Sequence, residues 1–583
     1  MMLDAITENL DVWTTAEVPK KSGGRGRGKA TKKSPHGIQK LRQLILELAV
    51  RGKLVPQDPN DEPASALLKK IAAEKNKLIK EGKIKKKKPL HNIDESEMPF
   101  DLPKNWEWGR LGDVTNYGIL DKTEPSEVDD STWVLELEDV EKVTSKLLQK
   151  VHFSERQSRS SKNRFRKNDV IYGKLRPYLD KVVIADEDGV CTTEMIPVRG
   201  YAAIAPQYLR LVMKSPFFIN YANDSTHGMN LPRMGTEKAR LALIPIVSEA
   251  EQHRIVAKVD ELMALCDELE REQTENSEAH QTLVETLLAT LTQAEGSEAF
   301  TEAWQRIAAH FDTLFTTEKS IDQLKQTILQ LAVMGKLAPQ NPNDEPASEL
   351  LKKIAAEKSR LIKEGKIKKQ KPLPPISEEE KPIELPQKWE WVRLGVALKK
   401  ITDGTHHSPP NGERGDYLYI SAKNIKNEGV QLSNATYVTK EVHEEIYSRC
   451  DPEYGDILYI KDGATTGIVT INDLSEPFSM LSSVALLKCT EGVLNSYLLL
   501  ALRAPFFYDE MRAGMTGVAI TRVTLKKLDH AFISLPPLEE QHRIVAKVDE
   551  LMALCDALKA RLQKAQITQI HLAETIVEQA VQG

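Results

Sequence analysis

The side chains best suited to contact an anionic ligand are concentrated in residues 150–181, where ten lysines and arginines stand against three acids. This local excess fits contact with DNA phosphates, although the net charge of the whole chain is only -5. The run includes Arg156, Arg159, Lys162 and Lys167 and ends in the loop GKLRPYLDK; a second polar loop, THGMNLPRM, begins at Thr226. Loops punctuated by glycine and proline often carry base-reading side chains. The candidate DNA contacts here are Arg164, Arg166, Lys174, Arg176, Tyr178, Lys181, His227, Asn230 and Arg233.

A second region, residues 399–535, has fewer basic side chains and more hydroxyl-bearing side chains. Its candidate DNA contacts are Thr405, His406, Lys461, Thr465, Thr466, Thr516 and Arg522. Because hydroxyls and guanidinium groups pair with different base edges, the two regions are expected to read different bases. A charged surface loop is the alternative for any single residue, whereas the clustering favours a DNA-binding face.

No catalytic centre can be assembled from the motifs of this chain. The sequence has no N-P-P-Y or D-P-P-Y motif of adenine methyltransferases, no glycine-rich cofactor loop after a strand, and no H-E-x-x-H, nucleophile-elbow or nuclease pattern. The stretch GGRGRGKA resembles a phosphate loop, but Ala30 replaces the required serine or threonine. His406 and His407 lack acidic or cysteine ligands at suitable spacing. The chain is therefore expected to bind rather than catalyse, with no catalytic residue, no metal site and no cofactor of its own.

The segments that must position these loops occur twice in the sequence. EQHRIVAKVDELMALCD occupies residues 251–267 and recurs unchanged at 540–556. LRQLILELAVRGKLVPQ, from Leu41, and NWEWGRLGDV, from Asn105, return in altered form from Leu324 and Lys388. Between these repeats the halves diverge, although NDVIYGKLRPYLDKV from Asn168 aligns faintly with GDILYIKDGATTGIV from Gly455. A retained frame with two divergent bodies suits a molecule that holds two readers of different targets.

Both copies of the identical segment begin long helices. Apolar residues recur at alternating spacings of four and three, as in a coiled-coil seam. The seam residues are Ile255, Val259, Leu262, Cys266 and Leu269, then Ile544, Val548, Leu551, Cys555 and Leu558. The pattern continues through Gln273, Asn276, His280, Leu283 and Leu287, and through Leu562, Ala565, Gln569, Leu572 and Ile576. Two helices of about 40 residues, roughly 60 Å long, are predicted to pack on each other. Two amphipathic helices that pack separately on their own domains are the alternative.

Shorter helices are predicted over residues 38–50 and 62–80, and strands over 182–185, 457–460 and 467–471. Tryptophans 106, 108, 389 and 391 belong to the repeated frame and are predicted to be core rather than stacking residues. Five scattered cysteines, no signal peptide and no membrane-length apolar run point to a cytoplasmic protein.

These repeated segments and loops together resemble the specificity (S) subunit of type I restriction-modification systems, in its larger, type IB form. The resemblance covers nearly the whole chain except the basic arm near the N-terminus. It implies an α+β fold in which two mixed, strand-rich target recognition domains are separated by two long antiparallel coiled-coil helices, with a pseudo-two-fold internal duplication. The expected segments are a basic flexible arm (1–36), a helical frame segment (37–98), target recognition domain 1 (99–248), the central coiled-coil helix (249–295), a second frame segment (296–381), target recognition domain 2 (382–537) and the C-terminal coiled-coil helix (538–583).

The resemblance implies that each recognition domain reads one half of a split, asymmetric site on double-stranded DNA. The coils would set the spacer and dock two methyltransferase subunits, which bind S-adenosylmethionine; restriction subunits would bring ATP and Mg. The first domain lacks the DGTH pattern of the second, which argues against matching the two residue by residue. A stand-alone bipartite DNA-binding regulator, a coiled-coil scaffold and a methyltransferase with an unrecognised motif are the alternatives.

Overall fold

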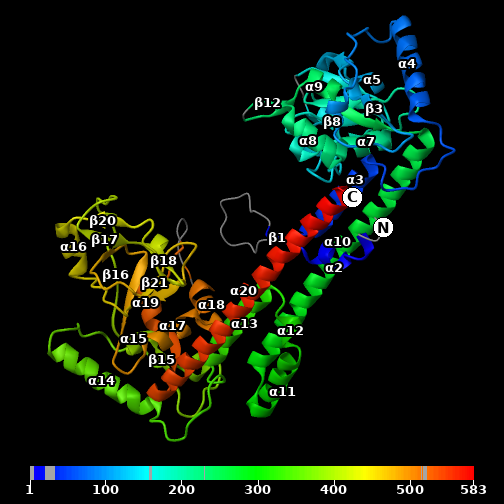
Figure 1. The fold of residues 1–583 in the computed structure, drawn as a ribbon. Helices are drawn as coiled ribbons and strands as arrows, with labels where there is room; N and C mark the ends of the chain where they lie inside the picture. Colours follow the sequence, from blue (N-terminus) through cyan, green and yellow to red (C-terminus); the bar gives the residue numbers. More distant parts are fainter. Residues whose placement is uncertain are drawn as a thin grey trace. The chain divides into compact units, whose positions relative to one another are not determined.

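The computed structural model describes residues 6–19, 33–156, 160–228, 230–513, 515 and 521–582. The chain divides into two compact units, one formed by Met1–Ser277 with Lys564–Gly583 and the other by Glu278–Gln563 (Figure 1). Both boundaries fall inside the longest helices, α10 (Glu249–Gln293) and α20 (Leu538–Gln582). Each unit therefore contains one frame segment, one divergent body and part of both long helices.

Each frame segment contains two corresponding helices, which in the second segment follow α11 (Gly296–Ala309) and α12 (Phe311–Leu314). They are α3 (His36–Val50) and α4 (Ala64–Lys80) in the first unit, and α13 (Glu318–Val333) and α14 (Ala347–Lys363) in the second. The helices predicted over 38–50 and 62–80 are thus confirmed. A glycine at positive φ lies two residues beyond each helix and ends it, because glycine adopts the left-handed conformation without a Cβ clash. These glycines are Gly52, Gly82, Gly335 and Gly365.

Part of the predicted flexible arm is folded. Helix α2 (Leu10–Thr15) packs on α3, with Trp13 fully buried and its indole N–H donating to Ile6 O at 3.2 Å. Gly37 allows this approach, because a Cβ there would lie 2.3 Å from Trp13 O. Strands β1 (Val18–Pro19) and β2 (Lys33–Ser34) then pair. The arm prediction over 1–36 is therefore wrong for residues 6–19, where one large aromatic side chain supplies the buried surface; the basic residues 20–32 lie outside the described residues.

The first body, residues 99–248, consists of small sheets with short helices. Its larger sheet has the order β4 (Lys122–Thr123), β7 (Lys162–Phe165), β10 (Gly189–Cys191), β5 (Trp133–Leu135), β6 (Val151–His152). A second sheet has the order β11 (Met195–Val198), β8 (Val170–Gly173), β9 (Val182–Ile184), and β12 (Thr226–His227) pairs with β13 (Arg233–Met234). The helices are α5 (Leu111–Val114), α6 (Phe153–Arg156), α7 (Pro206–Lys214), α8 (Pro216–Asp224) and α9 (Thr236–Leu241).

The second body, residues 382–537, has a related layout. One sheet has the order β16 (Leu398–Asp403), β24 (Val484–Cys489), β21 (Ile457–Ile460), β22 (Val469–Ile471). Another has the order β20 (Thr436–Val438), β17 (Tyr417–Ile420), β23 (Ser479–Met480), and β18 (Ile425–Lys426) pairs with β19 (Gly429–Val430). The helices are α15 (Leu394–Ala397), α16 (Lys440–Tyr447), α17 (Asn495–Arg503), α18 (Pro505–Ala513) and α19 (Leu525–His530). The three predicted strands are present as β9, β21 and β22.

Each body begins and ends on one antiparallel strand pair. Strand β3 (Glu107–Arg110) pairs with β14 (Leu243–Ile246), and β15 (Glu390–Arg393) pairs with β25 (Phe532–Leu535). The chain therefore leaves each body beside the point where it entered, directly before a long helix begins. Each body is in effect an insert whose interior can change while its attachment to the frame stays the same.

The repeated EQHR segment at the start of each long helix holds the frame to the body. Glu251 accepts hydrogen bonds from the Trp106 indole at 2.9 Å and from Gln57 at 2.7 Å. Glu540 repeats this with Trp389 at 2.9 Å and Gln340 at 2.6 Å. Burial raises the pKa of both carboxyl groups. The repeated segment therefore makes the same contacts in each unit. Trp106 and Trp389 are buried core residues, as predicted.

The seams of both long helices are buried together with a frame helix. Ile255, Val259, Leu262 and Cys266 share one hydrophobic cluster with residues of α3, and Ile544, Val548 and Cys555 share another with residues of α13. Arg42 of α3 pairs with Asp267 of α10 at 2.7 Å, and Lys53, beyond α3, donates to Val581 O of α20 at 3.4 Å. The frame helix therefore adds a third member to the predicted helix pair.

Four predicted seam residues face solvent instead. Leu283 is 51% exposed and Leu572 is 43% exposed, whereas the next residues, Val284 and Ala573, are almost fully buried. Asn276 and Ala565, also predicted in the seam, are exposed. The shift has a geometric cause, because a straight α-helix drifts by about 20° per heptad from a strict 3.5-residue repeat. One extra residue restores the buried face at the same place in both helices.

Candidate nucleic-acid interface

The two polar loops of the first body meet in space. The backbone N–H of Arg176 donates to Pro232 O at 2.7 Å, and that of Met234 donates to Lys174 O at 3.0 Å. Leu175 and Arg233 form an isolated antiparallel bridge. The structure therefore brings together Lys174, Arg176, Asn230 and Arg233, which the sequence placed in separate segments. The hairpin β12–β13 carries His227 opposite Arg233.

The second body contains the same arrangement. The backbone N–H of Gly463 donates to Thr521 O at 2.8 Å, and that of Val523 donates to Lys461 O at 2.8 Å. Asp462 and Arg522 form an antiparallel bridge. Lys461, Thr465 and Arg522 thus lie around one loop pair. Thr516, also predicted here, lies outside the described residues.

These two loop pairs correspond residue by residue. The three residues of the first loop at positive φ are Asn168, Arg176 and Asp180, and those of the second are Gly455, Gly463 and Gly467. Each lies 287 positions from its counterpart (455 minus 168, 463 minus 176, 467 minus 180). By the same offset Lys174 matches Lys461, and the shared bridge matches Arg233 with Arg522. The expectation that the two domains could not be matched is therefore wrong for this loop pair, because the backbone is shared even where the side chains differ.

Part of the basic run in the first body is structural. Arg156 pairs with Glu138 at 2.8 Å and with Glu136 at 3.2 Å, and it also contacts buried Asp139. Lys162 is 2% exposed and lies 3.4 Å from Glu136. Arg159 lies outside the described residues. The charge excess of residues 150–181 is thus partly neutralised by acids distant in sequence, which a count over a short window cannot include.

The remaining candidates of the first body differ in accessibility. Lys181 donates to Leu137 O at 2.6 Å and burial lowers its pKa, so it supports the loop from within. Arg164, on β7 between β4 and β10 of the larger sheet, donates to Thr123 Oγ1 at 2.7 Å. Tyr178 is 51% exposed at the tip of the loop. Arg166 is exposed in the turn between β7 and β8, outside the paired loops.

In the second body several predicted contacts hold the loop itself. Thr466 is fully buried and donates to Gly463 O at 2.7 Å, and Thr405 donates to His407 O at 3.0 Å. Lys461 is mostly buried and lies between Asp462 at 3.1 Å and Asp403 at 3.5 Å. The prediction that Thr405, Thr466 and Lys461 contact DNA therefore does not fit their burial. Exposed His406, 3.2 Å from Asp403, and Arg522 remain accessible.

The first loop is braced by residues that sequence reasoning missed. The Lys214 ammonium group donates to Asp180 at 2.6 Å, to Ser145 Oγ at 2.7 Å and to Val143 O at 2.9 Å. Val143 and Ser145 themselves have positive φ, which is costly for a β-branched residue such as Val143. In the second body Arg503 and Arg512 donate to Val469 O and Thr466 O at 2.9 and 3.0 Å. The echo of SPFF and APFF, which follow Lys214 and Arg503, was the available sequence signal.

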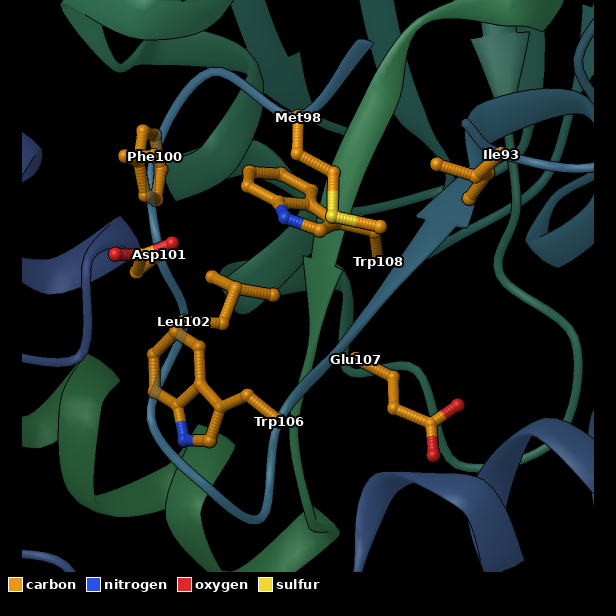
Figure 2. Close-up of a pocket in the computed structure, with 8 residues that line it drawn as sticks. All are labelled: Ile93, Met98, Phe100, Asp101, Leu102, Trp106, Glu107 and Trp108. Carbon is orange, nitrogen blue, oxygen red and sulfur yellow. The ribbon is translucent and has the colours of Figure 1, made fainter. Parts of the chain in front are cut away.

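A shallow pocket of about 310 Å³ lies elsewhere, on the frame side of the first body. Figure 2 shows Met98 over the ring of Trp108, with Phe100, Leu102 and Trp106 along one side. Its lining is mainly apolar and belongs to the repeated frame. The pocket is therefore separate from the paired loops and has no basic side chain for a phosphate.

Known proteins are similar to this chain over nearly its whole length. The Type I restriction enzyme EcoAI specificity subunit of Escherichia coli is 40% identical over 596 residues, with 99% of each chain covered. The chain belongs to this family of specificity subunits. The EcoEI specificity subunit of the same organism is also 40% identical over 99% of both chains. A family model described as the type I restriction modification DNA specificity domain matches residues 386–569.

A solved structure has a similar fold. It comes from work on complex assembly and conformational transition of the type I R-M system, and it matches with a TM-score of 0.51 and 22% identity over 83% of this chain and 99% of that chain. The mixed helix-and-strand fold of the specificity subunits is therefore present. In the described part of the chain, no helix could span a membrane.

Proposed function

We propose that this chain is the DNA sequence-specificity subunit of a type I restriction-modification complex. Each body acts as a target recognition domain and reads one half of a bipartite, asymmetric site on double-stranded DNA. The observation that carries this proposal is the matched loop pair, in which one backbone arrangement presents Lys174, Arg176 and Arg233 in one body and Gly463, Thr465 and Arg522 in the other. Two domains that read different bases require the same backbone support with different side chains on it.

The chain itself is proposed to be non-catalytic. Two methyltransferase subunits would dock on the duplicated frame, because a pseudo-two-fold molecule offers two like surfaces to two copies of one partner. S-adenosylmethionine would be bound by those subunits, and ATP and Mg by restriction subunits. The antiparallel long helices would set the spacer between the half-sites.

Exchange of one body tests the proposal. Residues 385–535 are replaced by the corresponding body of a relative with a different site, and the methylated sequence is determined in cells carrying the complete system. One half-site should change and the other should stay, because each body is attached through its own strand pair. Changes in both half-sites, or in neither, would contradict independent reading by the two bodies. The reciprocal exchange of residues 99–248 is the matched control and should alter the other half-site.

A further inference from the structure

Arg233 differs from Arg176, the other arginine of the first loop pair, in being held by a carboxylate. Its Nε group donates to both carboxylate oxygens of Glu194, at 3.1 and 3.0 Å. Its Nη1 group donates to Leu231 O at 3.3 Å. Among the described residues, Nη2 has no acceptor. The inner edge of the guanidinium is therefore fixed, while the side chain remains 36% exposed.

Glu194 is an unusual residue for a surface that meets DNA. A carboxylate is repelled by phosphates, so its presence lowers the general affinity of that surface for DNA. It is 27% exposed and forms its ion pair within the loop pair. A carboxylate in such a place is explained if it orients a neighbouring group, because an arginine bound through Nε keeps its terminal N–H groups available for a second, bidentate partner.

The second body has no carboxylate at the position that corresponds to Glu194. The backbone N–H of Lys174 donates to Glu194 O at 3.0 Å, and the backbone N–H of its counterpart Lys461 donates to Ser483 O at 3.0 Å. Ser483 therefore occupies the place of Glu194. Its hydroxyl accepts from the Ala422 N–H at 3.2 Å. Arg522, the counterpart of Arg233, has no carboxylate from this position.

We propose that Arg233 reads one guanine of the first half-site and that Glu194 is the positioning residue which orients its guanidinium toward that base. Two terminal N–H groups match O6 and N7 of guanine, the commonest specific arginine contact in the major groove. Pre-orientation removes the alternatives in which a flexible arginine binds a nearby phosphate. This inference rests on the proposed function and assigns one base contact within it.

The test uses the complete chain assembled with its methyltransferase subunits. The probes are DNA duplexes in which each base pair of the first half-site is replaced in turn. Glu194→Ser copies the residue of the second body, Arg233→Lys keeps the charge but not the fork, and Glu187→Ser is a matched control that breaks the exposed pair with Lys150. Binding to each duplex and to unrelated DNA is measured at fixed salt.

Both Glu194→Ser and Arg233→Lys should reduce discrimination at one guanine position by roughly 5- to 150-fold. Glu194→Ser should also bind unrelated DNA more tightly, because a negative charge has left the surface; a residue that only supports the fold would weaken all binding. The double variant should be no worse than Arg233→Lys alone, because Glu194 acts through Arg233. Glu187→Ser should leave discrimination unchanged.

Unchanged discrimination at every position of the first half-site in both variants would overturn the inference. An effect of Glu194→Ser on base discrimination that persists in the Arg233→Lys background would also overturn it. If Glu194→Ser fails to assemble, Arg233→Lys decides alone, with discrimination at the second half-site reporting that the molecule is folded. Failure of the proposed function would give a different result, because the wild-type complex would then discriminate between bases at neither half-site.

Discussion

At the residue scale, Arg176 and Gly463 show how one backbone serves two specificities. Both have positive φ, +51° and +86°, at the same place in the loop. Glycine adopts this conformation freely, whereas arginine pays a conformational cost and gains a basic side chain at the tip of the loop. The first body has thus kept a strained arginine where the second has an unstrained glycine, which favours a functional reason for the side chain.

Substitutions at these two positions should have unequal effects on stability. Gly463→Ala should destabilise the second unit by about 1 kcal/mol, because no atom obstructs a Cβ there and the left-handed backbone is the remaining cost. Arg176→Gly should change the free energy of unfolding by less than about 0.5 kcal/mol, since relief of strain offsets the greater freedom of glycine in the unfolded chain. Urea unfolding of the two purified variants, followed by tryptophan fluorescence, checks this. An equal loss in both would show that the loop conformations are not equivalent in energy.

At the element scale, sequence patterns predicted the positions of the helices and short strands. They did not predict which face of the long helices is buried toward their far ends. The identical EQHR segments predicted α10 and α20, and β21 begins and ends at the bounds predicted for residues 457–460 from their β-branched content. Leu283 was assigned to the seam because the spacing rule was extended without the drift of a real helix. Trp13 was missed because a six-residue helix leaves little periodic signal beside a basic, glycine-rich stretch.

The corrected seam can be tested by truncating adjacent residues. Val284→Ala removes two buried carbons from a side chain that is 1% exposed, so a loss of about 2 kcal/mol is expected. Leu283→Ala removes more carbon from a side chain that is 51% exposed and should change stability by less than about 0.5 kcal/mol. Thermal unfolding of the two variants beside the wild type measures the difference. A greater loss for Leu283→Ala would restore the strict heptad seam.

At the scale of the whole molecule, the site could be predicted as a region and not as a set of contacts. The loops GKLRPYLDK and THGMNLPRM were identified by composition, and the structure joins them through Arg176 and Pro232. The roles of Lys162, Lys181 and Thr466 depended on partners distant in sequence, which no local pattern contains. Glu194 was missed because its ion pair with Arg233 forms across 39 residues.

The long helices invite a prediction about the spacer between the half-sites. Four residues are added to α10 after Ser277 and four to α20 after Gln563, where each helix leaves one compact unit. Each insertion lengthens its helix by about 6 Å and turns it by about 40° beyond one full turn. One DNA base pair adds about 3.4 Å and roughly 35°. The rotation therefore fits a spacer longer by one base pair, with both half-sites unchanged.

Insertion into only one helix is the matched control and should abolish activity, because the two helices run antiparallel and must keep their pairing through the frame helices. Within the second unit α10 runs parallel to α13, because Gln323 donates to Glu285 at 2.9 Å and Lys336, just beyond α13, donates to Thr292 O at 3.1 Å. Helix α20 runs antiparallel to α13, because Lys559 donates to Asp322 at 2.9 Å and Gln563 donates to Glu318 at 3.1 Å. The readout is methylation of duplexes that differ only in spacer length. A double-insertion complex that is folded and active but still prefers the parental spacer would show that the helices do not set the distance. A shift of one base pair would show that the length of the two repeated helices sets the spacer length of the recognised site.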